Sequence, residues 1–317
     1  MLACIGSVAT DVPAETGKLR LCITHLGVFG PSTFVFAPYR APGTLEMTAA
    51  TRLSREVRFS LCPGGGIEST LNSPRSNTHV GWPTMSSPGG TAWRAVIEVE
   101  GIPNHRTGYL VGIDRIDAAV RAHALPRLLE RQSSSGLDMS EALDIVHQAV
   151  SENLDPRPSA TMLSIEPMTW WRIESSSMST LILRRRYEFS ASHRLHLPEL
   201  DEAANAELFG KCSNLNGHGH NYEVEVQVAC DREGETISVH RLDEVVDRVI
   251  IDRFDHKHLN LDVDDFRDRV ASVENIAARC VELLRDPIHT LPGTPRLDAV
   301  TVWETPRTAC TASNSSP

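Results

Sequence analysis

Three histidines in two short motifs could share one metal ion. His193 ends the run Phe-Ser-Ala-Ser-His, and one residue separates His218 from His220 in Gly-His-Gly-His. Side chains alternate between the two faces of a β-strand, so His218 and His220 would point the same way. Three protein ligands that leave one coordination position open are typical of a catalytic zinc site, whereas structural zinc sites close all four positions. These residues predict a zinc-dependent enzyme.

Side chains that could move protons accompany these histidines. Cys212 precedes His218, and Asp255 is followed directly by His256. A thiol with an ordinary pKa of about 8.5 needs only modest help to ionise, and an imidazole oriented by a carboxylate can act as a general acid–base. We therefore predict Cys212, Asp255 and His256 as catalytic residues. The structural alternatives are a small buried apolar residue for Cys212 and a helix-ending residue for His256. Three further histidines are expected to be solvated or to lie in a second layer around the site: His196, His240 and His258.

Charge and composition exclude several classes of protein. The 317 residues carry a formal net charge of −10, which argues against a nucleic-acid-binding surface because phosphate binding needs clustered lysine and arginine. No apolar run approaches the ~20 residues that span a bilayer, and the first residues lack the basic start of a signal peptide. The 7 cysteines are scattered without a Cys-x-x-Cys pair and are expected to be reduced thiols. We expect a soluble, cytoplasmic protein without a membrane or nucleic-acid partner.

An internal repeat indicates which elements position these residues. Residues 81–99 superpose on residues 210–228 without a gap, and residues 55–60 match 185–190 by pattern. Apolar residues with strand alternation then coincide in pairs: Trp93 with Tyr222, Ala95 with Val224, Ile97 with Val226, and Val99 with Val228. Each copy continues into two helices, the second around residues 141–150 or 274–285. Two copies of a β-β-α-α-type unit fit the length of the chain.

The first copy has lost the residues that could do chemistry. In this alignment Pro63 replaces His193, Gly89 replaces His218, Thr91 replaces His220, Pro83 replaces Cys212, and Leu129-Glu130 replaces Asp255-His256. Only Glu166 is expected to keep its counterpart, Glu304. We interpret the first copy as structural.

The repeat also suggests the domain boundaries. Residues 1–46 belong to neither copy and are expected to be a disordered or non-native leader. Residues 47–173 would form the degenerate domain, 174–179 a linker, 180–308 the active zinc domain, and 309–317 a tail.

The second copy closely resembles the 6-pyruvoyl-tetrahydropterin synthase and 6-carboxytetrahydropterin synthase family. The resemblance spans roughly residues 180–308 and rests on ordered motifs: Phe-Ser-Ala-Ser-His at 189–193, Leu-Phe-Gly-Lys-Cys at 208–212, Gly-His-Gly-His-Asn-Tyr at 217–222, Asp-His-Lys-His-Leu-Asn at 255–260, Ser-Val-Glu-Asn at 272–275 and Trp-Glu-Thr-Pro at 303–306. It implies the tunnelling fold of class α+β. In this fold a four-stranded antiparallel sheet carries two helices on one face, and subunits join their sheets into a barrel. Two tandem units would then give an oligomer, a trimer of two-domain chains.

The resemblance also implies the reaction and further site residues. Glu304 would bind the pterin ring, with Ser272 and Glu274 lining the same pocket, and Zn²⁺ would be the cofactor. The expected activity is that of a carbon–oxygen lyase, which converts 7,8-dihydroneopterin triphosphate to 6-pyruvoyl-tetrahydropterin with loss of triphosphate in tetrahydrobiopterin biosynthesis. Five residues separate Cys212 from His218, as in the pyruvoyl-type enzymes. The alternatives are a 6-carboxytetrahydropterin synthase of the queuosine pathway, a non-catalytic pterin-binding module and, more weakly, a zinc hydrolase.

Overall fold

The computed structural model describes residues 49–61, 91–135, 137–233 and 237–314. The expected leader at residues 1–46 lies outside them, and so do Pro63, Pro83 and Gly89. In the described part of the chain, no helix is both long and apolar enough to cross a membrane.

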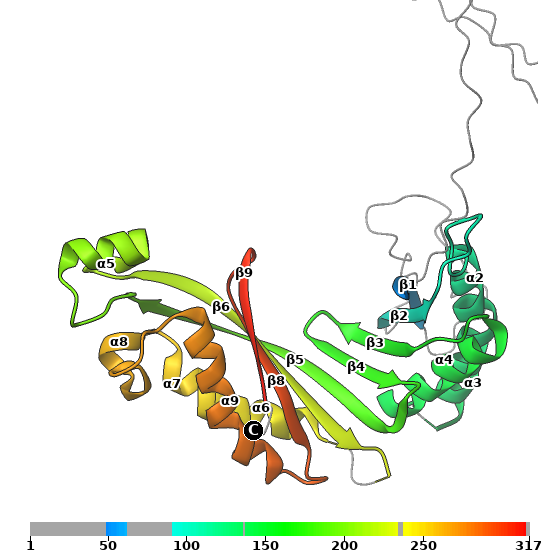
Figure 1. The fold of residues 1–317 in the computed structure, drawn as a ribbon. Helices are drawn as coiled ribbons and strands as arrows, with labels where there is room; N and C mark the ends of the chain where they lie inside the picture. The colour runs from blue at the N-terminus through cyan, green and yellow to red at the C-terminus, as the bar shows by residue number, and fades with distance from the viewer. Residues whose placement is uncertain (1–48, 62–90, 136, 234–236, 315–317) are drawn as a thin grey trace, which may run out of the picture. The chain divides into compact units, whose positions relative to one another are not determined.

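The first copy is a four-stranded antiparallel sheet with helices between its second and third strands (Figure 1). Its elements are β1 (Thr51–Leu61), β2 (Thr91–Gly101), α2 (Ile113–Ala118), α3 (Leu125–Ser135), α4 (Met139–Asn153), β3 (Ala160–Glu166) and β4 (Thr169–Glu174). A π-helical segment, Ala119–Ala124, joins α2 to α3. The predicted apolar stripe is buried at Ile116 and Val120, whereas Ile113 at the start of α2 is 52% exposed.

The second copy repeats this order with additional short elements around the predicted site. Its strands are β5 (Ser177–His193), β6 (His218–Asp231), β7 (Lys257–His258), β8 (Arg296–Thr305) and β9 (Thr308–Ser313). Its helices are α5 (Glu202–Phe209), α6 (Val239–Val246), α7 (Asp252–Phe254), α8 (Leu259–Asp262) and α9 (Val273–His289). Short helical turns cover Gly210–Ser213, Asp247–Ile251 and Asp264–Phe266. Antiparallel strands with separate helices confirm the predicted α+β class.

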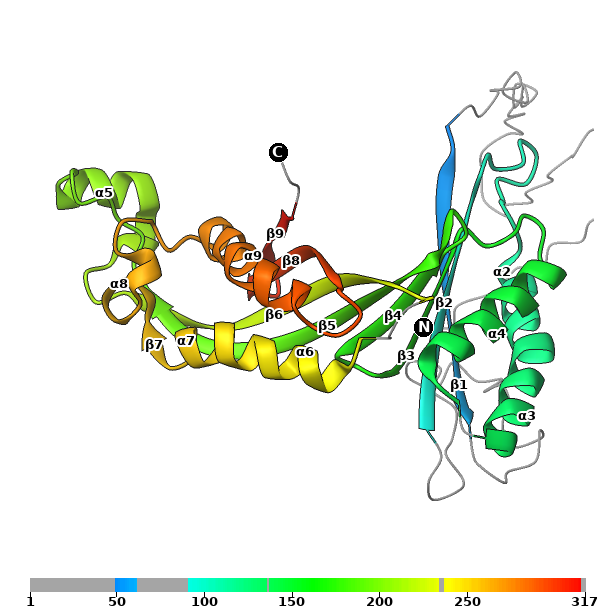
Figure 2. The ribbon, with the colours of Figure 1, turned by 90° about the horizontal axis from the view of Figure 1, so that it is seen from below.

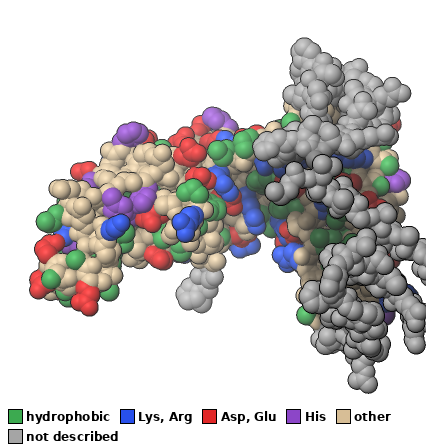
Figure 3. Space-filling model, turned by 90° about the horizontal axis from the view of Figure 1, so that it is seen from above, with side chains coloured by type: hydrophobic (Ala, Val, Ile, Leu, Met, Phe, Trp, Pro, Cys, Tyr) green, Lys and Arg blue, Asp and Glu red, His purple; other side chains and the backbone are tan. Residues whose placement is uncertain are grey.

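The long strands alternate between a buried and a polar face. Tyr222, Val224, Val226 and Val228 of β6 are fully buried, as the alternation predicts. In Figure 2 α6, α7 and α9 lie along the sheet of the second copy, whereas α5 lies beyond the ends of β5 and β6, and α9 contacts both β8 and β9. Figure 3, viewed from the opposite side, shows basic side chains interspersed with acidic ones. Ion pairs between neighbouring strands, such as Arg186 with Glu223 and Glu225, account for such a mixture.

The sheets of the two copies are continuous within the chain. β4 pairs antiparallel with β5, so the strand order runs β1-β2-β3-β4-β5-β6-β8-β9. Residues 174–179, which the sequence suggested as a linker, are instead the end of β4, a two-residue turn and the start of β5. The reason is the backbone pairing of Glu174 with Ser177, which closes a tight hairpin that polar serines favour.

Candidate active site

Strand pairing brings the three predicted ligand histidines together. His193, the last residue of β5, lies directly opposite His218, the first residue of β6, and His220 lies opposite Ala191. The Nε2 atoms of His193 and His218 are 3.2 Å apart. Glu304 of β8 approaches the same point, with its Oε1 atom 3.2 Å from Nε2 of His193 and 3.6 Å from Nε2 of His220. One potential ligand atom from each of these four residues lies within 4.8 Å of every other.

The surroundings of the histidines suit a metal better than a hydrogen-bond network. Nδ1 of the fully buried His193 lies 2.6 Å from the carbonyl oxygen of Ala271, so this nitrogen donates a proton and Nε2 keeps its lone pair. Nε2 of His220, the nitrogen that faces Glu304, is buried without a hydrogen-bond partner. Unpaired buried nitrogens are uncommon and call for an explanation such as an ion. Burial lowers the pKa of His193 to about 4, so its imidazole is neutral at physiological pH, as a ligand must be.

Cys212 is not a member of this group. The thiol is half-buried in the short turn that follows α5, and the Cys212 carbonyl oxygen accepts a hydrogen bond of 2.9 Å from the backbone of Leu195. This bond ties the cysteine segment to the chain just after His193. Buried Asn205 of α5 further anchors the intervening loop, because its side chain bonds the backbone of Leu197 and Leu200.

Asp255 and His256 form a hydrogen-bonded pair at the edge of the sheet. Nδ1 of His256 lies 2.7 Å from Oδ2 of Asp255, and Oδ1 of Asp255 accepts from the backbone N–H of Ser190 at 2.8 Å. The Ser190 bond is the main reason that the pKa of Asp255 lies below its ordinary value. The His256 ring is 83% exposed, and neither residue of the pair is a member of the histidine–glutamate group.

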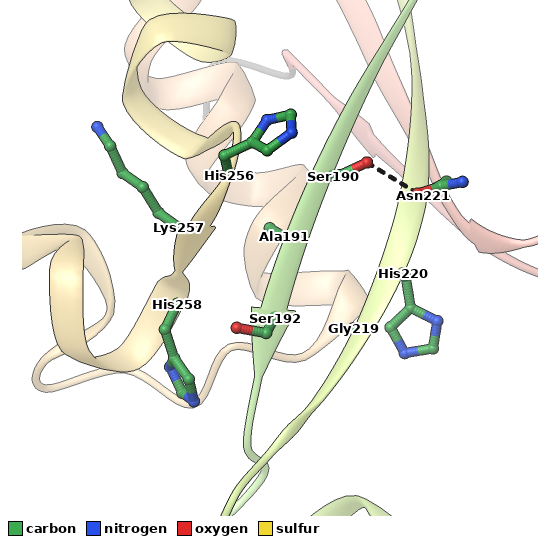
Figure 4. Close-up of a pocket in the computed structure, with 9 residues that line it drawn as sticks. All are labelled: Ser190, Ala191, Ser192, Gly219, His220, Asn221, His256, Lys257 and His258. Carbon is green, nitrogen blue, oxygen red and sulfur yellow. Dashed lines mark hydrogen bonds between the residues drawn. The ribbon is translucent and has the colours of Figure 1, made fainter.

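His256 and one of the ligand histidines, His220, line the same cleft of about 500 Å³. Figure 4 shows His256 beside β5 and the His220 ring beyond β6, with the Ser190 and Asn221 side chains hydrogen-bonded across the two strands. His258 lines the same cleft, and its Nδ1 atom is buried without a partner. Sequence analysis gave His258 a solvated or second-layer role, and its place in the cleft agrees with the second layer.

Ser272 and Glu274 lie at the start of α9, directly after Ala271, whose carbonyl oxygen contacts His193. Ser272 caps α9, because its hydroxyl accepts from the backbone N–H of Asn275 at 3.4 Å, and Glu274 is exposed in the first turn of the helix. The sequence did not reveal Ala271 as the partner of His193. A backbone carbonyl leaves no trace in residue type, so no signal could have identified it.

The first copy lacks the ligand set at the positions that the structure describes. Thr91 lies opposite Leu61 as His220 lies opposite Ala191, so threonine does occupy the position of a ligand histidine. The expected match of Glu166 with Glu304 is wrong. Arg94 pairs with Ser164 as Glu223 pairs with Trp303, which places exposed Ile165 at the position of Glu304.

The two β-hairpins explain this one-residue error. Glu166 pairs with Thr169, and Thr305 pairs with Thr308, so each copy has a two-residue turn that begins with proline. The two copies correspond correctly when Pro167 is aligned with Pro306, rather than Glu166 with Glu304. Because strand side chains alternate, a shift of one residue exchanges the two faces. The first copy therefore has no carboxylate at the position of Glu304.

Comparison with known proteins identifies relatives of the second copy. The family model described as 6-pyruvoyl tetrahydropterin synthase matches residues 182–315. The 6-pyruvoyl tetrahydrobiopterin synthase of Drosophila melanogaster is 40% identical over 135 residues, which cover 42% of this chain and 79% of that protein. The Homo sapiens protein of the same name is 44% identical over 96 residues, 29% of this chain and 66% of that protein. Among solved structures, the 6-pyruvoyl tetrahydropterin synthase of Caenorhabditis elegans is 36% identical, covers 43% of this chain and 96% of its own, and aligns with a TM-score of 0.38.

Proposed function

Because this chain belongs to the 6-pyruvoyl tetrahydropterin synthase family, we propose that it is a lyase that converts 7,8-dihydroneopterin triphosphate to 6-pyruvoyl-tetrahydropterin and releases triphosphate. The observation that carries this proposal is the convergence of His193, His218, His220 and Glu304 on one point, with the tautomer of His193 fixed by Ala271. The family match covers the second copy, so the activity is assigned to that copy.

The donor set fits a zinc ion. His193, His218 and His220 would hold it through imidazole nitrogens, which leaves a position for substrate or for the Glu304 carboxylate. A bound zinc ion supplies Lewis acidity that polarises hydroxyl groups of the substrate side chain. Because buried His193 is neutral at physiological pH, its imidazole is in the form that binds a metal ion.

The protein's own side chains would perform the proton transfers. The Cys212 thiolate removes a proton from side-chain carbon, and His256, held by Asp255, delivers and accepts protons at the side-chain oxygens. Triphosphate leaves with its bonding electrons, and the remaining steps are tautomerisations that need no external oxidant. The Glu304 carboxylate would accept hydrogen bonds from the guanidine-like edge of the pterin, with Ser272 and Glu274 near the ring.

The chain would act as a homo-oligomer, a trimer of two-copy chains. The His256 ring is 83% exposed, and it is related to His220 only because both residues line the same cleft. To bring all the proposed residues together around a substrate, this cleft must be closed further. A second subunit that covers this cleft would supply this closure.

Two other functions remain as outcomes of the same experiment. A 6-carboxytetrahydropterin synthase would release acetaldehyde, and a pterin-binding module would release nothing. The five residues between Cys212 and His218 favour the pyruvoyl product.

Triphosphate release and the mass of the pterin product test the proposal. The zinc-loaded protein is incubated with dihydroneopterin triphosphate beside Cys212→Ser and the matched thiol control Cys310→Ser. We expect 6-pyruvoyl-tetrahydropterin from the parent and the control, and a loss of roughly 100-fold or more in kcat for Cys212→Ser. A carboxy product, or no turnover by the metal-loaded parent, would overturn the proposal.

A further inference from the structure

The side chain of Arg194 is bound to the turn that carries Cys212. Arg194 follows His193 directly, and only 12% of its side chain is exposed. Its Nε atom donates to the carbonyl oxygen of Ser213 at 2.8 Å. Ser213 follows Cys212 directly and is itself buried. The arginine therefore ties the cysteine turn to the end of β5.

A backbone bond lies next to this contact. The N–H of Leu195 donates to the carbonyl oxygen of Cys212 at 2.9 Å, so two consecutive carbonyls of the turn accept from two consecutive residues after β5. Within the turn, Oγ of Ser213 donates to the carbonyl oxygen of Gly210 at 2.8 Å. A substitution of Arg194 removes its side-chain bond and leaves both of these bonds in place. The arginine side chain is thus the part of this anchor that mutation can test.

The backbone of Arg194 also contacts the segment that follows His256. Its N–H donates to Oδ1 of Asn260 at 2.8 Å, and Asn260 lies on α8. The segments of His193, Cys212 and His256 therefore meet at one residue.

The carboxylate partner of Arg194 does not account for its buried position. Nη2 of Arg194 lies 2.6 Å from Oε2 of Glu202, but the Glu202 side chain is 63% exposed. Ion pairs with exposed partners contribute little to stability. A hydrogen bond from a charged donor to a buried carbonyl is stronger than a neutral one. The bond to Ser213 is therefore the contact that we expect to matter.

Tyr222 relates the position of Cys212 to the ligand histidines. Burial is the main cause that raises the pKa of Tyr222, and the nearby Glu304 and Cys212 raise it further. The Tyr222 ring centroid lies 6.0 Å from that of His193 and 5.6 Å from that of His220. Electrostatic influence falls with distance, so Cys212 and the ligand histidines lie around the same tyrosine.

We infer that Arg194 is a positioning residue, which keeps Cys212 at the place from which its thiolate reaches the substrate. The inference rests on the proposed function, in which Cys212 removes a proton from the substrate side chain. Arg194 contacts no substrate in this account and acts only through the cysteine turn.

Kinetics of Arg194→Met test this role. A reacting group that is misplaced by about 1 Å costs roughly 100-fold in rate, so we expect kcat to fall by about that factor while KM stays near the parent value. Zinc content should not change, because Arg194 is not a member of the ligand group. Arg194→Lys keeps the charge and the stem without the planar fork of donors, and it should lose less.

Arg232→Met is the matched control. The Arg232 side chain is 13% exposed and, like Arg194, bonds both a carboxylate, that of Asp144, and a backbone carbonyl, that of Met178 at 3.0 Å. It follows the far end of β6 from His218. We expect its kcat to match the parent.

The double variant Arg194→Met with Cys212→Ser shows whether the arginine acts through the thiol. Once the thiol is gone, loss of Arg194 should change kcat by less than about 2-fold. The same 100-fold loss in both backgrounds, or an unchanged kcat in Arg194→Met alone, would overturn the inference.

Thiol alkylation tests the position of Cys212 without substrate. The zinc-loaded proteins are treated with iodoacetamide, and the peptides of Cys212 and Cys310 are followed by mass spectrometry. We expect Arg194→Met to raise the rate at Cys212 by about 10-fold, because one lost hydrogen bond favours local opening of the turn. The rate at Cys310 on β9 should not change, and Arg232→Met should behave as the parent. Equal rates at Cys212 in Arg194→Met and the parent would overturn the inference. Faster alkylation in Arg194→Met, with a parent that releases no triphosphate, would uphold the anchor and refute the proposed activity.

Discussion

Nδ1 of His193 lies 2.6 Å from the carbonyl oxygen of Ala271, a residue 78 positions further along the chain. This bond assigns the ring proton to Nδ1 and directs the lone pair of Nε2 toward His218 and Glu304. The segment before α9 thereby sets the protonation state of a residue on β5. Such outer contacts orient a ligand ring and raise its basicity.

Removal of His193 should abolish tight metal binding. We expect His193→Ala, after zinc loading and dialysis, to retain far less zinc than the parent when metal content is measured by mass spectrometry, since two imidazoles bind zinc less tightly than three. His240→Ala, at a side chain 79% exposed on α6, is the control. Equal zinc content in His193→Ala and the parent would contradict the ligand set.

Gly217 should tolerate no side chain. Its φ is +68°, and an added Cβ would lie 2.7 Å from the His193 carbonyl oxygen and 2.9 Å from Nε2 of His258. Gly217→Ala should therefore lower both zinc affinity and thermal stability. Gly108→Ala is the matched control, because its φ is +72° but nothing lies within 4 Å of the added atom. The strain of a left-handed backbone costs about 1–2 kcal/mol and is common to both changes. An equal loss of stability in Gly217→Ala and Gly108→Ala would therefore rule out a steric clash at Gly217.

Arg55 and Arg185 occupy equivalent strand positions in the two copies, and we expect them to contribute differently to stability. Arg55→Met removes a partly exposed two-pronged contact with Asp117, and we expect a loss of about 1 kcal/mol in the free energy of unfolding. Arg185→Met also removes the bonds to Glu166 and Thr169, so its loss should be larger, about 3 kcal/mol. Urea denaturation at one protein concentration measures both. If Arg185→Met lowered the free energy of unfolding no more than Arg55→Met does, the bonds from Arg185 to Glu166 and Thr169 would contribute nothing to stability.

His147 should make the first copy sensitive to acid. Its ring is buried between Thr161, 3.0 Å from Nδ1, and Ser175, 3.3 Å from Nε2, and burial lowers its pKa below 6.5. As pH falls below 6.5, the unfolded chain binds a proton that the folded chain refuses, so stability declines by up to about 1.4 kcal/mol per pH unit. Urea denaturation between pH 7.5 and about 5.5 should show a shallower decline for His147→Gln than for the parent. Parallel declines would contradict this assignment.

His256 should act in turnover and not in metal binding. His256→Asn removes the ring that Asp255 holds at 2.7 Å, and we expect kcat to fall by roughly 100-fold or more. Zinc content should stay at the parent level because His256 is not a member of the ligand group. Steady-state kinetics and metal analysis on the same preparation measure both. Unchanged kcat would assign the Asp255–His256 pair a structural role at the sheet edge.

The sequence by itself determined the features that depend on local periodicity. The alternation of His218 and His220, the buried face of β6 and the duplicated order of strands and helices follow from spacing along the chain. Such patterns survive in the sequence because each residue's face is set by its neighbours.

Only the tertiary structure decided the contacts between distant segments. It placed Ile165, rather than Glu166, at the position of Glu304, because cross-strand pairing and not residue identity sets the register. It also supplied the Ala271 carbonyl to His193 and carried the sheet from β4 into β5. Backbone groups make these contacts, and every residue carries the same backbone, so residue types alone could not reveal them.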